Sequence, residues 1–196
     1  MLLAALPLNV EAAQCDRCCL HAKKGLGIGN PMARLLLVAQ NPGKEVRQNT
    51  ARIPFEIQHW ETGTATKSSQ VLRDMMLDAG LGWDDFYVTN VMKCEGIVLP
   101  AYIGNCGDWL ERELLALSEL HLIVVMGEIA ARRLVAPSVG RLGWYSSRLQ
   151  PGKQWPVTRV AHPAAPLYPD GISRAAYQQQ WLFVASVYRM LTERGM

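Results

Sequence analysis

The chain has no apolar run of the roughly 18 residues that a membrane-spanning helix needs. Its apolar beginning, residues 1–10, has no basic start and no cleavage site after it, which favours an N-terminal helix or arm over a secretory signal peptide. Internal repeats and low-complexity segments are also absent. Charged residues make up only 19% of the sequence and hydrophobic residues 49%, which is typical of a globular protein. We therefore expect one cytoplasmic domain over residues 1–196, with no membrane contact.

The net charge of the chain is small. A formal charge of +3 does not by itself indicate a polyanionic partner, because many proteins without such a partner are equally basic. If the protein binds nucleic acid, its cationic side chains must gather locally.

The five cysteines are odd in number and unevenly spread, which argues against a disulfide framework. Cys15 and Cys18 form a C-x-x-C pair, in which two thiolates can hold one metal ion or one corner of an iron–sulfur cluster. Cys94 and Cys106 are the candidates for the remaining ligands, and Cys19 is left out because its side chain should point away from that of Cys18. Four thiolates suit zinc or a 4Fe–4S cluster, with a structural role in both cases. Alternatively, Cys94 and Cys106 are small buried hydrophobic residues.

Short apolar runs alternate with helical patterns along the chain. Four runs rich in Val, Leu or Ile have the character of buried parallel strands: residues 35–39, 86–91, 122–126 and 157–161. Helical spacing of apolar residues covers residues 70–79, 108–120, 128–135 and 173–193. This alternation predicts an α/β fold with a doubly wound sheet of about four parallel strands and flanking helices. Residues 56–66 and 137–154 are predicted to be long irregular surface loops.

Polar residues follow three of the four predicted strands. Gln40 and Asn41 come after the first, Asn90 ends the second, and His162 follows the fourth. Doubly wound sheets bind ligands at the carboxyl ends of their strands, so we expect these side chains to converge on one site. The third strand runs into Gly127 and offers little chemistry.

Five motifs follow one another from Cys15 to the last predicted helix. They are Cys15-x-x-Cys18; Gly27-Ile28-Gly29-Asn30-Pro31 with the run 35–43 and Ile53-Pro54-Phe55; Thr89-Asn90-Val91-Met92-Lys93-Cys94; Cys106 with Trp109-Leu110-Glu111; and His162-Pro163-Ala164-Ala165. In this order they resemble the motifs of the family-4 uracil-DNA glycosylases. The resemblance implies a monomeric, monofunctional DNA repair enzyme that hydrolyses the N-glycosidic bond of uracil, or of another deaminated base, in DNA. It also implies a 4Fe–4S cluster as cofactor, held by Cys15, Cys18, Cys94 and Cys106.

Such an enzyme must draw the base out of the duplex into a pocket, at a cost of roughly a few kcal/mol. By the resemblance, Phe55 stacks on the base, although it is otherwise a core residue. Asn90 can accept a hydrogen bond from uracil N3–H and donate one to O4, and its alternative role is to cap a turn. His162 is the candidate that stabilises negative charge on uracil O2. Gln40 offers backbone contacts to the base, and Gly43 lets the chain approach DNA closely.

A water molecule must then attack the sugar carbon, for which a carboxylate would serve as base. Asn41 lies where the family usually reads G-E-A-P-G, and its amide can orient water but cannot ionise. We therefore expect slower turnover than an aspartate would give at this position. The alternative is that Gln40 and Asn41 form a plain turn between a strand and a loop.

Contacts to the rest of the DNA have three candidates. Lys67 and Ser69 stand at a predicted helix start and offer phosphate a cation, a hydroxyl and N–H groups, although such hydroxyls are more often N-caps. Leu167 lies in an apolar segment after His162 and is a candidate wedge for the gap left by the flipped base; the alternative is that it packs against the body of the protein. Two other functions stay open: a DNA-binding protein of the same fold without catalysis, and a four-cysteine zinc protein.

Overall fold

The computed structural model describes residues 6–18, 25, 27–42, 55, 65–94 and 100–194. Its centre is a six-stranded sheet in the order β1-β3-β2-β4-β6-β5. The strands are β1 (Ile28–Gly29), β2 (Leu35–Ala39), β3 (Phe86–Asn90), β4 (Leu122–Met126), β5 (Leu142–Ser146) and β6 (Gln154–Val160). The four inner strands are mutually parallel, and the edge strands β1 and β5 pair antiparallel to their neighbours.

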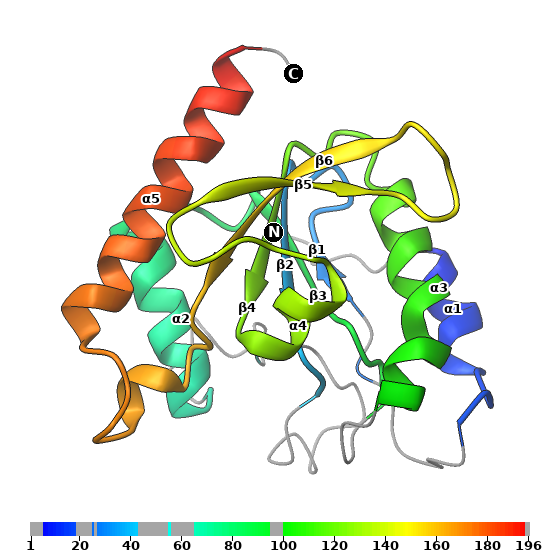
Figure 1. The fold of residues 1–196 in the computed structure, drawn as a ribbon, viewed down its shortest axis with the longest axis horizontal. Coiled ribbons are helices and arrows are strands. Elements are labelled where there is room, and N and C mark those ends of the chain that lie inside the picture. Colours follow the sequence, from blue (N-terminus) through cyan, green and yellow to red (C-terminus); the bar gives the residue numbers. More distant parts are fainter. Residues whose placement is uncertain are drawn as a thin grey trace.

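Helices cover both faces of the sheet (Figure 1). The elements are α1 (Leu8–Ala13), α2 (Lys67–Asp78), α3 (Pro100–Ala116), α4 (Glu128–Arg133) and α5 (Arg174–Glu193), with a short 3-10 helix at Ala165–Leu167. The side chains of β2 alternate between two cores, as the period of a strand requires. Leu35 and Leu37 join the core under α2 and α5, whereas Leu36 and Val38 join the core under α3 and α4. Within the described residues, no helix is both long and apolar enough to cross a membrane.

The inner strands and four of the helices lie where the sequence predicts them, with shifted ends. Helix α3 begins at Pro100 instead of residue 108 and ends at Ala116 instead of residue 120. Two glycines, Gly104 and Gly107, lower the helix propensity of the added turns, and tertiary packing of Cys106 and Gly107, both buried, outweighs it. The N-terminal helix occupies Leu8–Ala13; residues 1–5 of the predicted helix or arm, and 56–64 of the predicted loop, lie outside the described residues.

The prediction of an irregular loop over residues 137–154 was wrong, because this stretch contains β5. Tyr145 is the one buried residue of this strand, while Leu142 and Trp144 are exposed, so the sequence lacks the pattern of a half-buried strand. Tyr145 instead donates a hydrogen bond to the buried carboxylate of Glu111, which also accepts from Ser147 Oγ at 3.0 Å. Burial and then this hydrogen bond raise the pKa of Tyr145 to about 12. Glu111 thus fastens the β5–β6 hairpin to α3.

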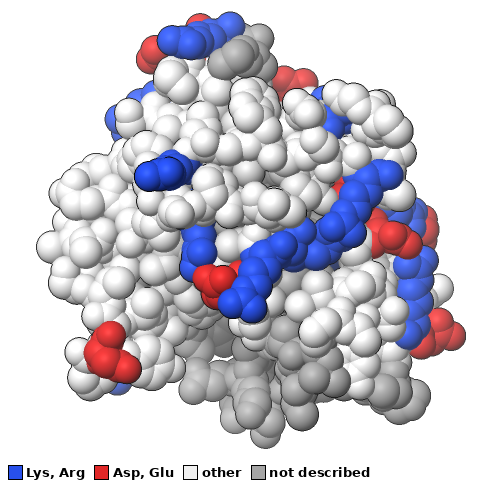
Figure 2. Space-filling view, viewed as in Figure 1, with Lys and Arg blue, Asp and Glu red and all other residues white. Residues whose placement is uncertain are grey.

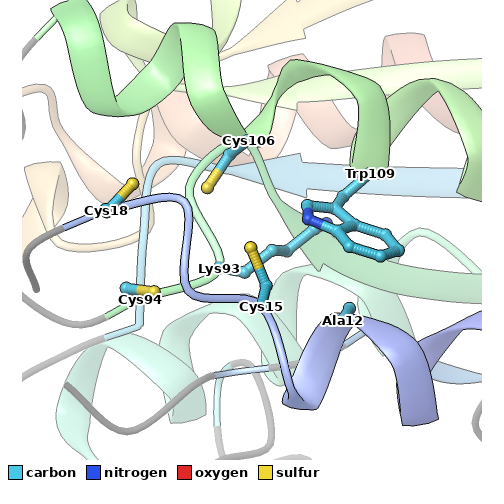
Figure 3. A pocket seen from close by; sticks show the side chains of 7 residues that line it. All are labelled: Ala12, Cys15, Cys18, Lys93, Cys94, Cys106 and Trp109. Atoms are coloured by element: carbon cyan, nitrogen blue, oxygen red, sulfur yellow. The ribbon is translucent and has the colours of Figure 1, made fainter. Parts of the chain in front are cut away.

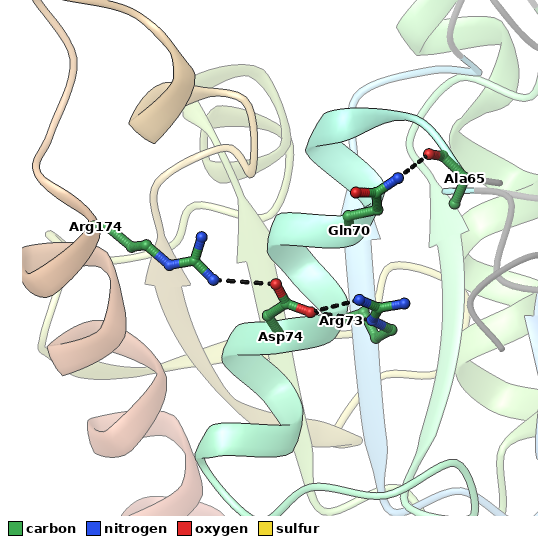
Figure 4. Close-up of polar contacts among 5 residues, drawn as sticks. All are labelled: Ala65, Gln70, Arg73, Asp74 and Arg174. Atoms are coloured by element: carbon green, nitrogen blue, oxygen red, sulfur yellow. Dashed lines mark hydrogen bonds and ion pairs between the residues drawn. The ribbon is translucent and has the colours of Figure 1, made fainter. Parts of the chain in front are cut away.

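Helix α2 is held near its start and in its middle by polar contacts (Figure 4). Asp74 accepts from Arg174 of α5 at 3.0 Å and from Arg73 at 2.8 Å. Gln70 donates to the carbonyl of Ala65 at 2.6 Å, which secures the chain as it enters the helix. These bonds fix the beginning of α2 beside the carboxyl edge of the sheet, where the candidate site lies.

Candidate functional site

The carboxyl ends of the parallel strands carry the predicted polar residues in one row. Asn90 closes β3 opposite Ala39 of β2, and the pairing continues past both strands, since Met92 N–H donates to the carbonyl of Gln40 at 3.0 Å. His162 follows β6, the outermost of the four parallel strands on the other side. Asn90 and His162 therefore lie toward opposite ends of the row, with Gln40 between them.

Asn90 is buried, with 2% of its surface exposed. Its side-chain nitrogen Nδ2 is buried and has no hydrogen-bond partner within the described residues. A buried donor without an acceptor costs about 1–3 kcal/mol, and such groups are rare in native proteins. The amide therefore lacks an acceptor that a bound ligand can provide.

His162 is arranged as a neutral hydrogen-bond donor. Its Nδ1 accepts from the backbone N–H of Ala164 at 3.2 Å, which assigns the imidazole proton to Nε2. Burial lowers the pKa of His162 below its ordinary value, so the ring is uncharged at neutral pH. An uncharged Nε2–H suits an acceptor that gains negative charge during a reaction.

The backbone around His162 is fixed by contacts that the sequence does not reveal. Gly127, which we expected to contribute little, has φ +89, and a Cβ there would lie 3.3 Å from Cβ of His162. Gln180 of α5 accepts from the N–H of Ala161 at 2.7 Å, and Ala165 N–H donates to the carbonyl of His162 at 2.8 Å. The end of β4 therefore supplies room for the histidine.

Phe55 lies against His162, with ring centroids 6.1 Å apart and ring planes at 42°. Its φ is +54, in the left-handed region that a bulky residue rarely adopts and that is found most often at functional sites. The hydroxyl of Ser69 donates to the carbonyl of Phe55. Ser69 is fully buried, so its hydroxyl holds the Phe55 backbone, whereas the sequence suggested that it contacts phosphate.

The other predicted residues lie around this core of the site. Lys67 is exposed at the first position of α2, and Leu167 is 43% exposed in the short helix after His162. Asn41 is half-buried, and its Nδ2 donates to the carbonyl of Pro42 at 3.3 Å. Gly43 lies outside the described residues.

Four cysteines from three separate segments line one pocket (Figure 3). Cys15 and Cys18 follow α1, Cys94 follows β3, and Cys106 lies in α3. Among the described residues, no three His, Cys, Asp or Glu side chains converge closely enough to hold a single metal ion. The four thiols therefore face one pocket, and thiolates are ligands both of zinc and of iron–sulfur clusters.

A side chain of α3 also contacts the segment that carries Cys15 and Cys18. Asn105 donates to the carbonyl of Arg17 at 3.0 Å and to Sγ of Cys18 at 3.5 Å. Burial raises the pKa of the Cys106 thiol, and a hydrogen bond from the Lys93 backbone partly opposes this shift. A cationic metal centre would reverse the effect of burial by favouring the thiolate.

A buried ion pair joins the cysteine pocket to the candidate base site. Lys93 lines the pocket, and its Nζ lies 2.5 Å from Oε2 of Glu113, with both side chains at most 3% exposed. Nζ also donates to Oγ1 of Thr89 at 2.6 Å and to the backbone carbonyl of Asn90 at 2.8 Å. This pair was not predicted from the sequence, although Glu113 lies among Leu110, Leu114 and Leu117 at the core spacing of a helix.

Comparisons with known proteins place the chain in a family. The model of the uracil DNA glycosylase superfamily matches residues 26–184, a range that contains the whole sheet but not Cys15 and Cys18. The type-4 uracil-DNA glycosylase of Archaeoglobus fulgidus is 31% identical over 172 residues, covering 81% of this chain and 80% of that protein. The type-5 uracil-DNA glycosylase of Thermus thermophilus is 32% identical over 125 residues, covering 56% of this chain and 53% of that protein.

Proposed function

The chain belongs to the uracil DNA glycosylase superfamily, and from this membership we propose that it is a single-domain, monofunctional repair enzyme that excises uracil from DNA and leaves an abasic site. The observation that carries the proposal is the buried side-chain amide of Asn90, whose Nδ2 has no partner within the described residues. Uracil O4 is the acceptor that this nitrogen lacks, and uracil N3–H is a donor for Oδ1. Cytosine has the opposite pattern on the same edge and would leave both atoms of the amide unpaired.

The remaining residues of the site act on the flipped base. Phe55 stacks on its face, in a backbone conformation that Ser69 holds. His162 donates from Nε2 to uracil O2 and stabilises the negative charge that develops there as the glycosidic bond breaks. The backbone of Gln40 contacts the base between Asn90 and His162, and Asn41 orients the attacking water.

The DNA itself is held at the edge of the site. The exposed cation of Lys67 at the start of α2 neutralises a phosphate, and Gly43 allows close approach of the backbone. Leu167 stands exposed on the segment after His162 and fills the space that the flipped base vacates.

The proposal is tested with a labelled duplex that contains one deoxyuridine, incubated with the protein and then treated with alkali. Strand cleavage at that position is the expected result, and a matched duplex with deoxycytidine should stay intact. Duplexes with hypoxanthine or xanthine test other deaminated bases. An intact uracil duplex in a folded sample would contradict the proposal.

The fall of the excision rate at low pH, the acidic limb of the pH–rate profile, should be caused by protonation of His162. Because burial lowers its pKa, the neutral donor persists as the pH falls to about 6.5, where a free histidine would be half protonated. At lower pH the imidazolium can no longer accept a hydrogen bond from the Ala164 N–H, and the rate of excision should fall. The neutral ring also contributes to folding stability. This contribution is fully present above about pH 6.5 and is lost over the same lower pH range. Single-turnover rates between about pH 4.5 and 8.5 measure this limb.

A His162→Gln variant serves as the control, because it keeps an N–H donor but does not titrate. It should excise about 10²–10³-fold more slowly and lack the acidic limb. An acidic limb that survives in this variant would assign the titration to another group.

We further propose that the cysteine pocket holds a 4Fe–4S cluster, ligated by Cys15, Cys18, Cys94 and Cys106. Support comes from the four sulfurs around one pocket and from the identity to a type-4 relative. A closed set of four thiolates leaves no open coordination position, so the cluster would supply structure, fastening the segment after α1 to β3 and α3.

Removing one ligand should abolish the cluster. Wild-type protein is expected to be brown, with iron and acid-labile sulfide in equal amounts, and Cys106→Ala should lose most of both and melt at a lower temperature. Cys19→Ala is the matched control. It removes the thiol next to Cys18, which is not a proposed ligand, and should leave the iron content unchanged. A colourless wild-type protein containing zinc would replace the cluster with the zinc alternative.

A further inference from the structure

A second pocket lies outside the candidate base site, between α3 and α4. Its volume is about 410 Å³, within the range of small-molecule sites. Pro100, Ile103 and Ile129 supply apolar surface, and Arg132 and Arg133 supply positive charge. None of its described lining residues is acidic. The pocket therefore combines an apolar floor with two guanidinium groups.

Arg133 is the unusual member of this pocket. Its Nη1 is buried and has no hydrogen-bond partner within the described residues. No ion pair of Arg133 is found there either, whereas Arg132 pairs with Glu128 at 2.8 Å and is 78% exposed. The Arg133 side chain as a whole is only partly buried and lines the pocket, so its positive charge can attract an anion bound there.

A glycine of the neighbouring helix α3 lies against this guanidinium group. Gly107 of α3 is buried, and a Cβ there would lie 2.6 Å from Nη2 of Arg133. The absence of a side chain at residue 107 thus allows the guanidinium to lie against α3. An arginine that only covered the surface would need no such space.

Helix α4, whose Ile129, Arg132 and Arg133 line the pocket, connects it to the candidate base site. Helix α4 starts directly after Gly127, whose backbone packs against His162. Lys and Arg side chains form a diagonal band across the face that carries α4 and the β5–β6 hairpin, with acidic side chains beside its lower end (Figure 2).

We propose that the α3–α4 pocket is a phosphate-binding site for a nucleotide unit. Arg132 and Arg133 hold the phosphate group, and the apolar floor packs against the attached sugar. The phosphate comes either from the DNA backbone beside the excised base or from a free nucleotide. Binding of a DNA phosphate rests on the proposed function, whereas binding of a phosphate group as such does not depend on it.

The test is the salt dependence of binding to a fluorescein-labelled duplex without uracil, measured by anisotropy. Each phosphate contact adds about 0.9 to the slope of log K against log salt concentration. Arg133→Gln should reduce the slope by about 1 and weaken binding by about tenfold at low salt. Gly107→Ala should do the same without changing any charge, because its Cβ displaces the guanidinium, and thermal melts should find it as stable as wild type.

Arg141→Gln is the matched control, since it removes one exposed arginine outside the pocket. It should leave the slope unchanged. The DNA source is excluded if Arg141→Gln acts like Arg133→Gln, which would mean a general charge effect, or if Gly107→Ala binds the duplex like wild type.

A thermal-shift titration with dTMP separates the two sources. Stabilisation of wild type but not of Arg133→Gln assigns a free nucleotide to the pocket, and an Arg133 effect on duplex binding alone assigns the DNA backbone. No Arg133 effect with either ligand overturns the inference. Uracil excision together with Arg133-independent binding of both ligands would remove this inference alone, and Arg133-dependent binding without excision would remove the proposed function alone.

Discussion

Replacing Asn90 with leucine should slow uracil excision by about a thousandfold or more while leaving the protein at least as stable as wild type. The base would lose both hydrogen bonds on its recognition edge and would be buried with unpaired polar atoms. The Nδ2 atom of Asn90 has no partner within the described residues, so its removal costs the folded protein no hydrogen bond to them. Single-turnover excision and thermal melting measure the two effects separately.

Asn30 provides the matched control for this substitution. Its amide is satisfied, donating to the carbonyl of Asp84 at 2.7 Å and accepting from Met32 N–H at 2.9 Å. Asn30→Leu should therefore lower the free energy of unfolding by about 1–2 kcal/mol and leave excision nearly unchanged. Normal excision by Asn90→Leu would show that the unpaired amide does not recognise the base.

The inner strands could be predicted because the sheet is covered on both faces. Each of β2 and β4 places every residue in one of two cores, which produces the continuous apolar runs of a buried parallel strand. The edge strands carry no such signal. β1 has only two residues, and β5 owes its position to pairing with β6 and to the carboxylate of Glu111, which lies far away in sequence.

The candidate site divides in the same way. The positions of Asn90 and His162 at the ends of strands could be predicted from the sequence, because a polar residue at the end of an apolar run is a local pattern. The contacts of Ser69 with Phe55 and of Gly127 with His162 join segments that are distant in sequence, so no local pattern predicts them. Glu113 is intermediate, since a charged residue at core spacing is a local signal, but its partner Lys93 becomes known only from the fold.

Breaking the buried ion pair should have the largest effect on stability. Lys93→Met leaves the Glu113 carboxylate buried without its cation, and such a loss typically costs about 3–5 kcal/mol. The substitution also removes the ammonium group that donates a hydrogen bond to the backbone carbonyl of Asn90. Excision should therefore slow even under conditions in which the variant is folded. Urea unfolding followed by circular dichroism measures the stability, and single-turnover rates measure the excision.

A double variant separates the charge from the packing. Lys93→Met combined with Glu113→Leu removes both charges and should recover most of the lost stability, because apolar pairs of similar volume replace buried ion pairs at little cost. Arg174→Met, which breaks an exposed ion pair with Asp74, is the matched control and should cost less than about 1 kcal/mol. Recovered stability with slow excision would mean that Lys93 positions Asn90 in addition to stabilising the fold. If the double variant is less stable than either single variant, the two residues contribute through separate contacts, and the link between the cysteine pocket and the base site is absent.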